Sequence, residues 1–387
     1  MAFFGLYVHT PFCPQRCPYC GFSVVTGRDH LQQRYIAAVC TELETVAADS
    51  GFPALDSVFF GGGTPSRVQP SLLEQVLETA RQTVGFTDDA EITIEANPGT
   101  TDAASYGALR ALGFNRISIG AQSLVAESLK RLGRIHSVED VVAAFGLARD
   151  AGFDNISVDL IFSVPGADAD SWRRSLEKVI ALGPEHISTY SLTIEAQTPF
   201  AARVDAGQLR VRSEDDSAQE YELAMEVLAE AGYEHYEISN FCLPGHRCHH
   251  NWACWMGGEY IGVGVSAHSF MDGCRSWNDR DLMNYMEAVE EGRTPRSGDE
   301  RLTPAAAMQE RLWLGLRTSQ GVELSIHELG TLTTHSRAQA MVGAGYLEFE
   351  RSQLRLTSAG FAVADELSVD VALILEQAAA GSSGSLG

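Results

Sequence analysis

The sequence predicts an α/β fold built on a parallel sheet. Short apolar runs rich in β-branched residues alternate with amphipathic stretches from the start of the chain to about residue 195. The runs are continuously apolar, which is typical of parallel strands buried on both faces. Six strand–helix pairs in series favour a closed or partly open (β/α)6 barrel over a doubly wound sheet. We therefore expect a barrel core over residues 1–200.

The expected strands follow one another in a regular order. They are "LYVHT", "SVFFGG", "EITIEA", "RISIGA", "ISVDLIF" and "HISTYSLTI", and helices are expected over 30–49, 70–84, 101–112, 138–151 and 171–182. Active sites of such barrels lie at the C-terminal ends of the strands. Candidate functional residues lie at these strand ends in the first five units: Cys13, Gly61–Thr64, Glu95, Gln122 and Asp159.

The remaining half of the chain has a different pattern. A long helix over 213–231, an aromatic strand "YEHYEISNF" and a segment rich in Gly, His and Trp lead us to assign 201–300 to completion of the barrel. Thr303 and Gly321 bracket a further helix. Helices near 324–330 and 335–344, a hairpin in "YLEFERSQLRLT" and a last helix to about 377 resemble a winged-helix module over 301–378. We expect residues 379–387 to form a flexible tail.

Composition restricts the classes of partner. The 387 residues carry 28 basic and 51 acidic side chains, a net charge of -23, which opposes non-specific binding to nucleic acid and gives the winged-helix-like module a packing or partner role. No apolar run reaches the roughly 18 residues of a membrane span, and the first residues do not resemble a signal peptide. We expect a cytoplasmic protein, in which the eight cysteines are ligands or core residues rather than disulfides.

The segment "HTPFCPQRCPYCGF" places Cys13, Cys17 and Cys20 at the spacing C-x3-C-x2-C. Buried core, a zinc site and redox thiols are the alternatives to an iron–sulfur loop. The prolines indicate a loop, and a structural zinc ion needs four ligands. Three thiolates at this spacing suit a [4Fe–4S] cube in which one iron has no protein ligand.

This loop, with Tyr19 before its third cysteine, resembles that of the radical S-adenosylmethionine (SAM) superfamily. The resemblance implies a partial radical SAM barrel in which SAM chelates the open iron and can be cleaved to a deoxyadenosyl radical. "FFGGGTPSRV" resembles the family's glycine-rich turn, with a plain tight turn as the alternative. "IEANPGT", "ISIGAQS", "LKRLGRIHS" and "VDLIFSVPG" recur in oxygen-independent coproporphyrinogen oxidases and HemW-type haem chaperones, so the resemblance covers about residues 5–375.

The resemblance implies a set of cofactor-binding residues. The positions that would contact SAM are Tyr7, Tyr19, Gly62, Gly63, Thr64, Glu95, Gln122, Arg134 and Asp159. Glycines would let backbone amides approach the polar end of SAM. A carboxylate such as Glu95 or Asp159 suits ribose hydroxyls, and Arg134 suits a carboxylate through a bidentate fork. An ion pair at the barrel rim is the alternative for Asp159 and Arg134.

Two segments separate the branches of this family. The oxidases resemble C-x3-C-x2-C-x-C and carry a longer N-terminal segment, whereas here Phe22 replaces the fourth cysteine and the first strand begins by Phe4. Phe22 matches the chaperone branch, although Gly21 stands where that branch usually has Asp. Residues 250–255, "HNWACW", resemble the haem-associated H-N-x-x-Y-W of the chaperones, with Cys254 in place of tyrosine.

An imidazole or a thiolate can bind haem iron, and tryptophan rings can cover the macrocycle. His250 is the first candidate ligand and Cys254 the second. Polar packing and a metal site of Cys248, His249, His250 and Cys254 remain alternatives. We expect His268 to support the SAM pocket and Cys40 to lie in the core.

These features favour a [4Fe–4S] radical SAM-type haem chaperone that passes haem to an acceptor protein and draws on an electron donor. The rival is an oxygen-independent coproporphyrinogen III oxidase, so enzymatic activity stays open. A radical enzyme acting on an unrelated substrate is the third interpretation, because a fold does not fix function.

Overall fold

In the computed structural model, which describes residues 3–48 and 51–383, twelve strands form one mixed sheet. Its centre consists of six adjacent parallel strands: β1 (Phe4–Thr10), β4 (Leu55–Gly62), β5 (Phe86–Ala96), β6 (Arg116–Gln122), β7 (Ile156–Phe162) and β8 (His186–Ser191). The six predicted parallel strands are therefore confirmed. Among the described residues β1 and β8 do not pair with each other, so the barrel is open.

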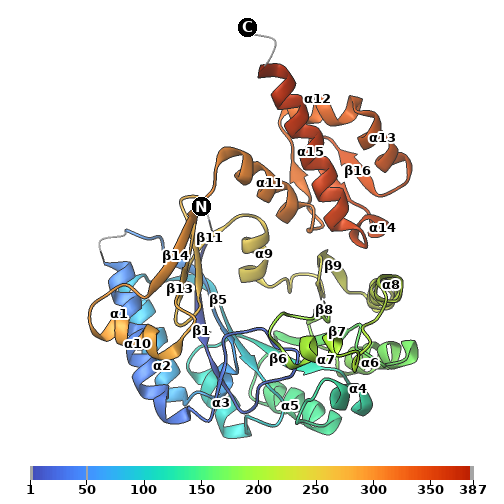
Figure 1. The fold of residues 1–387 in the computed structure, drawn as a ribbon. Helices are drawn as coiled ribbons and strands as arrows, with labels where there is room; N and C mark the ends of the chain where they lie inside the picture. The colour runs from blue at the N-terminus through green and yellow to red at the C-terminus, as the bar shows by residue number, and fades with distance from the viewer. Residues whose placement is uncertain (1–2, 49–50, 384–387) are drawn as a thin grey trace.

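Helices cover the outer face of this curved sheet (Figure 1). They are α1 (Gln32–Ala47), α2 (Pro70–Thr83), α3 (Ala103–Ala111), α4 (Ala126–Arg131), α5 (Val138–Asp150) and α6 (Ala169–Leu182), of which α4 was not expected. Asp102, Ser137 and Asp168 cap α3, α5 and α6 by accepting backbone N–H bonds, each contributing about 1 kcal/mol. Alternate strand residues such as Leu6, Val58 and Ile117 are fully buried beneath the helices.

The inner face of the parallel strands is polar. The strand register aligns Ser57 with Glu91, Thr93 with Arg116, Ser118 with Ser157, and Asp159 with Ser188. A barrel interior is usually filled by branched apolar side chains. This lining therefore indicates that the interior serves a polar ligand rather than packing alone.

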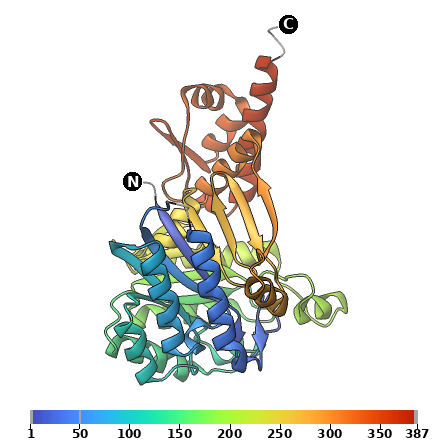
Figure 2. The same ribbon diagram turned by 90° about the vertical axis from the view of Figure 1, so that its left-hand side faces the viewer.

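The sheet continues beyond both ends of these six strands. Beside β1 lies β11 (Glu259–Val263), which is also parallel to it, followed by the antiparallel strands β12 (His268–Met271), β13 (Cys274–Asn278) and β14 (Arg296–Arg301), as Figure 2 shows. Beside β8 lie β10 (Asn240–Cys242) and β9 (Glu234–Glu237). The expected sixth strand ends early, at Ser191. The expected strand "YEHYEISNF" is instead the hairpin β9–β10, because the Glu237 carboxylate accepts bonds from Ser239 N and Asn240 and turns the chain.

Helix α9 (His249–Trp255) lies between the two ends of the open sheet (Figure 1). It begins on Glu91, whose carboxylate accepts bonds from the backbone N–H groups of His249 and His250 at 3.0 and 3.2 Å. Other connecting helices are α7 (Pro199–Asp205), α8 (Glu214–Glu230) and α10 (Leu282–Glu290).

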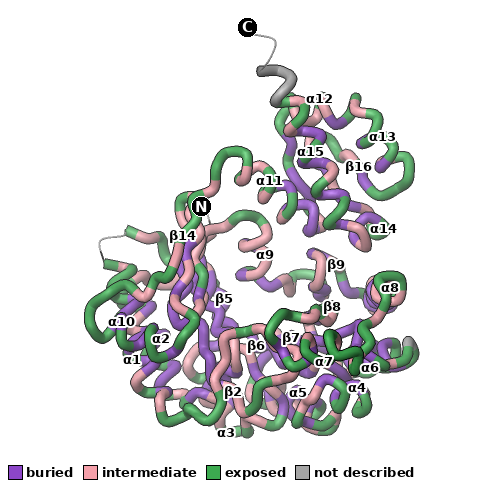
Figure 3. The backbone as a smooth tube through the Cα atoms, viewed as in Figure 1, coloured by how far each residue is buried: buried purple, intermediate pink, exposed green. Residues whose placement is uncertain are grey.

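The C-terminal module stands at the end of the barrel where the parallel strands begin (Figure 1). It contains α11 (Pro304–Gly315), β15 (Val322–Glu323), α12 (Ile326–Thr334), α13 (Ser336–Gly343), β16 (Leu347–Glu350), β17 (Gln353–Leu356), α14 (Ser358–Phe361) and α15 (Ala364–Ser383). It has the helices and hairpin expected of it, and Figure 3 shows its own buried centre. Helix α15 continues to Ser383, into the stretch expected to be a tail, and 384–387 lie outside the described residues. The domain boundaries at 200 and 300 stay predictions.

Candidate functional site

A cavity of about 490 Å³ lies at the C-terminal ends of the parallel strands. Ten of the thirteen predicted site residues line it: Cys13, Cys17, Tyr19, Cys20, Gly62, Gly63, Glu95, Gln122, Arg134 and Asp159. The loop that carries the cysteines starts and ends at two short parallel strands, β2 (Phe12–Cys13) and β3 (Val25–Thr26). The structure therefore brings together at one cavity residues that lie up to 146 positions apart.

The three cysteines do not form a binding site for a single metal ion. All three are free thiols, and within 3–48 and 51–383 no three His, Cys, Asp or Glu side chains are close enough to bind one metal ion. A cube places each thiolate on a different iron. Burial raises the pKa of the Cys13 thiol to about 11 and also raises that of Cys20. Loading of iron must therefore displace protons.

Arg134 joins the cysteine loop to the strand ends. Its guanidinium donates to Cys17 Sγ at 3.3 Å, to Asn97 Oδ1 at 2.8 Å and to the Gly120 carbonyl at 3.0 Å. Burial raises the pKa of Cys13, and the positive charge of Arg134 offsets a small part of that rise. The suggested rim ion pair is wrong for both Arg134 and Asp159, since neither forms a salt bridge among the described residues.

Two half-buried carboxyl groups, Glu95 on β5 and Asp159 on β7, face the cavity from strands that β6 separates. Burial and then the charge of Asp159 raise the pKa of Glu95 to about 8, and Glu95 Oε2 accepts the Gly62 N–H at 3.0 Å. Burial also raises the pKa of Asp159, against the effect of Ser118 Oγ, which donates to it at 2.9 Å. Carboxyl oxygens held in this way can receive ligand hydroxyls.

Close packing gives the glycine turn a physical reason in addition to the expected one. Gly62 has φ +110°, and a Cβ there would meet the His9 ring at 2.5 Å. A Cβ on Gly63 would lie 2.8 Å from backbone atoms of Thr10 and Pro11. The missing side chains thus allow β4 to approach the end of β1.

The other predicted residues occupy distinct places. Thr64 is fully buried beneath the loop, with its Oγ1 3.5 Å from Cys13 Sγ. Gln122 has φ +63°, a strained conformation typical of functional sites. Tyr19 packs on Phe200 with ring centroids 6.1 Å apart. The resemblance did not single out Asn97, which donates to Thr64 Oγ1 at 2.6 Å and directly follows β5.

A second cavity of about 570 Å³ extends along the inner face of β1, β4 and β11. Its lining includes Tyr7, His9, Phe59, His250, Cys254, Tyr260, His268 and Trp277, and it shares Gly21 and Phe22 with the first cavity. Tyr7 therefore faces this cavity and not the one lined by the cysteines. His250 is buried, with its Nδ1 2.7 Å from Ser57 Oγ and its ring against Phe59 and Tyr260.

Two expectations for this region are wrong. A metal site of Cys248, His249, His250 and Cys254 is not formed, because Cys248 donates to Glu91 and His249 lines another cavity. Trp252 also lines that other cavity, and the tryptophan that lines the second cavity with His250 is Trp277. Cys40 packs against the core, as expected.

Comparisons with known proteins assign the class first. The family model of the radical SAM superfamily matches residues 7–179, which include all three cluster cysteines and every lining strand up to β7. The chain is 36% identical over 365 residues to a heme chaperone HemW of Mycobacterium tuberculosis, covering 94% of this chain and 93% of that protein. It is 40% identical over 325 residues to the one from Synechocystis, covering 82% and 78%. Within the superfamily, the chain belongs to the HemW family.

A solved structure supports the fold. Coproporphyrinogen III oxidase (HemN) from Escherichia coli, a radical SAM enzyme, superposes with a TM-score of 0.81 at 22% identity, covering 96% of this chain and 90% of that one. This likeness establishes the shared architecture, including the C-terminal module. The superfamily implies a [4Fe–4S] cluster and SAM, and the cysteine-lined cavity fits both. No helix in the described part of the chain is long and apolar enough to cross a membrane.

Proposed function

We propose that the protein binds haem in the second cavity and transfers it to an acceptor protein. The observation that carries the proposal is the combination of aromatic rings and a fixed, buried imidazole at His250. Haem needs a flat apolar surface and an axial ligand, such as a neutral imidazole. Phe59, Tyr260 and Trp277 offer the rings. Several relatives, from Mycobacterium tuberculosis, Synechocystis and Bacillus subtilis, carry the name heme chaperone HemW.

The choice between the two candidate ligands follows from their surroundings. Burial lowers the pKa of His250 to about 4, so its imidazole is neutral at physiological pH. Burial raises the pKa of Cys254 to about 12, which disfavours the thiolate that haem iron would need. His9 also lines this cavity, but its two ring nitrogens form hydrogen bonds with Tyr7 and with the Ser23 carbonyl, so neither is available to bind iron. His250 is therefore the proposed ligand, with Nδ1–H donating to Ser57.

The cysteine-lined cavity would hold the cluster on Cys13, Cys17 and Cys20 and SAM on the strand ends. When bound there, the cluster would supply electrons one at a time to SAM. Arg134 would hold the cysteine loop in place against the Gly120 carbonyl. Glu95 and Asp159 would accept hydrogen bonds from hydroxyl groups of the cofactor. A cytoplasmic location is part of the proposal, since all eight cysteines are free thiols.

Haem titration of anaerobically reconstituted protein tests the proposal through the Soret band. His250→Ala should shift the band and lower affinity, and Ser57→Ala should weaken binding by about tenfold because it releases the ligand's second nitrogen. His249→Ala is the matched control, because this neighbour on α9 is exposed and lines a different cavity. Equal losses in His249→Ala and His250→Ala, or none in either, would contradict the assignment.

A further inference from the structure

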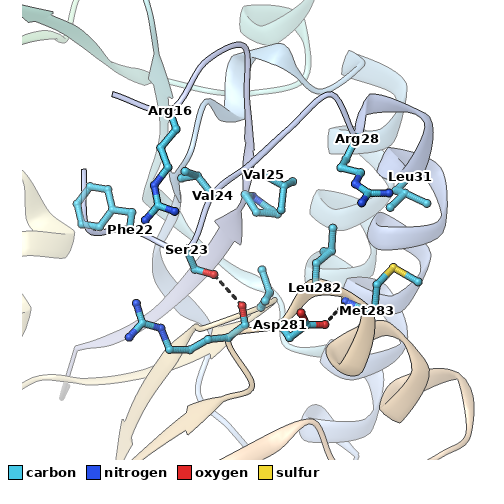
Figure 4. Close-up of a pocket in the computed structure, with 13 residues that line it drawn as sticks. Arg16, Phe22, Ser23, Val24, Val25, Arg28, Leu31, Asp281, Leu282 and Met283 are labelled. Carbon is cyan, nitrogen blue, oxygen red and sulfur yellow. Dashed lines mark hydrogen bonds between the residues drawn. The ribbon is translucent and has the colours of Figure 1, made fainter. Parts of the chain in front are cut away.

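A groove of about 370 Å³ lies beside the cysteine loop (Figure 4). Three arginines, Arg16, Arg28 and Arg280, reach it from three segments, and we call it the arginine groove. The rest of its lining is mostly apolar: Pro11, Phe22, Ser23, Val24, Val25, Leu31, Val265, Asp281, Leu282 and Met283. The segments are held together by Ser23 Oγ, which donates to the Arg280 carbonyl at 3.0 Å, and by Arg280, which donates to the Gly21 carbonyl.

The arginine groove carries excess positive charge. None of its three arginines forms an ion pair among residues 3–48 and 51–383. The acidic groups nearby are already engaged. Asp281 caps α10 by accepting bonds from Met283 N and Asn284 N at 2.9 and 3.0 Å, and Asp29 pairs with Arg67 at 2.7 Å. In a chain with a net charge of -23, three guanidinium groups whose charge no described acidic side chain pairs with create a local positive potential that attracts anions.

The groove also offers apolar surface. Phe22 is 66% exposed and Met283 is 38% exposed, and Figure 4 shows their side chains at opposite margins of the groove. Arginines together with exposed aromatic and methionine side chains are typical of protein interfaces. Contacts of this size suit transient partners, such as those that exchange electrons.

The groove also lies next to the place of the cluster. Arg16 stands between Cys13 and Cys17 in the sequence and donates to the Cys20 carbonyl at 3.3 Å. Arg16, Phe22 and Val24 line both the groove and the cysteine-lined cavity. A protein seated in the groove would therefore be separated from the cluster by a single layer of side chains.

We propose that the arginine groove docks an acidic one-electron carrier protein that reduces the cluster. One electron leaves the reduced centre of the carrier and enters the [4Fe–4S]²⁺ cluster, which becomes [4Fe–4S]⁺ while the carrier is oxidised by one electron. No bond forms or breaks. The strongly negative remainder of the surface repels an acidic carrier, so productive encounters are confined to the groove.

Two measurements with an acidic flavodoxin test the docking proposal. The first is its binding to the reconstituted protein at low and at high salt. The second is the rate at which flavodoxin hydroquinone reduces the cluster. The double variant Arg28→Glu/Arg280→Glu should weaken binding by at least about tenfold at low ionic strength and slow reduction in proportion. Reduction by dithionite should not change, because dithionite needs no docking. Arg173→Glu, an exposed and unpaired arginine on α6, is the matched control and should stay within about twofold of the parent.

Three results would overturn the proposal: unchanged binding in the double variant, binding of the parent that does not depend on salt, or equal losses in Arg173→Glu. Self-association through the groove, lost in the double variant while flavodoxin binding persists, would assign the groove to a second copy of the chain instead. Iron content, measured for every variant, keeps a loss of docking distinct from a loss of the cluster.

Discussion

Replacing Gly63 by alanine tests the link between strand packing and the cysteine loop. The added Cβ would lie 2.8 Å from the carbonyl carbon and oxygen of Pro11 and from the Thr10 oxygen. These are backbone atoms, and the Gly63 N–H also donates to the Thr10 carbonyl at 2.8 Å, so neither strand can move without losing a bond. Overpacking of this kind costs about 1–3 kcal/mol of the free energy of unfolding. We expect a lower melting temperature and a displaced loop that holds less iron.

Thermal unfolding followed by circular dichroism, with iron content after anaerobic reconstitution, measures both effects. Gly146→Ala provides the matched control, because a Cβ there meets nothing within 4 Å inside α5. Helix propensity should make that variant more stable by up to about 1 kcal/mol. A Gly63→Ala protein with parental melting temperature and full iron content would refute the reasoning.

Three further predictions concern the cysteine-lined cavity. Cys17→Ala should abolish the visible absorbance of the reconstituted cluster, whereas Cys40→Ala should retain it. Loss of the absorbance in both variants would contradict the assignment of the cluster to the cysteine loop. Arg134→Lys should weaken the effect of SAM on the electron paramagnetic resonance signal of the reduced cluster by about tenfold, because an ammonium cannot reproduce the three guanidinium contacts. The pKa of Glu95 is about 8 in the folded protein, against an ordinary value of 4.5. The contribution of its protonated carboxyl group to the free energy of unfolding is therefore complete below about pH 4.5 and is lost as the pH rises through about 8. Melting temperatures across that pH range should show this loss in the parent but not in Glu95→Gln. Plots of melting temperature against pH that run parallel for the two proteins would contradict the prediction.

The sequence was sufficient for the features that depend on local pattern. Apolar runs of strand length predicted the six parallel strands, because a buried parallel strand must be apolar along its length. The barrel rule then placed residues as distant as Cys13 and Asp159 at one cavity. Cap residues such as Thr303 were identified from helix chemistry alone, and Thr303 accepts the Ala306 N–H.

Features that depend on distant contacts could not be predicted. The position of Tyr7 in the second cavity depends on β11 pairing with β1, and their partners are about 255 positions apart. The reason for Gly63 is visible only once the backbone of Pro11 lies against it. The arginine groove joins Arg16 and Arg280, which no local pattern relates.

The central claim is that this chain carries haem rather than decarboxylating its precursor. Reconstituted protein with SAM and reductant is incubated anaerobically with coproporphyrinogen, and a parallel sample is titrated with haem. We expect stable haem binding with a defined Soret band and no protoporphyrinogen. Formation of protoporphyrinogen together with an absence of haem uptake would contradict the account and assign the chain to the oxidases.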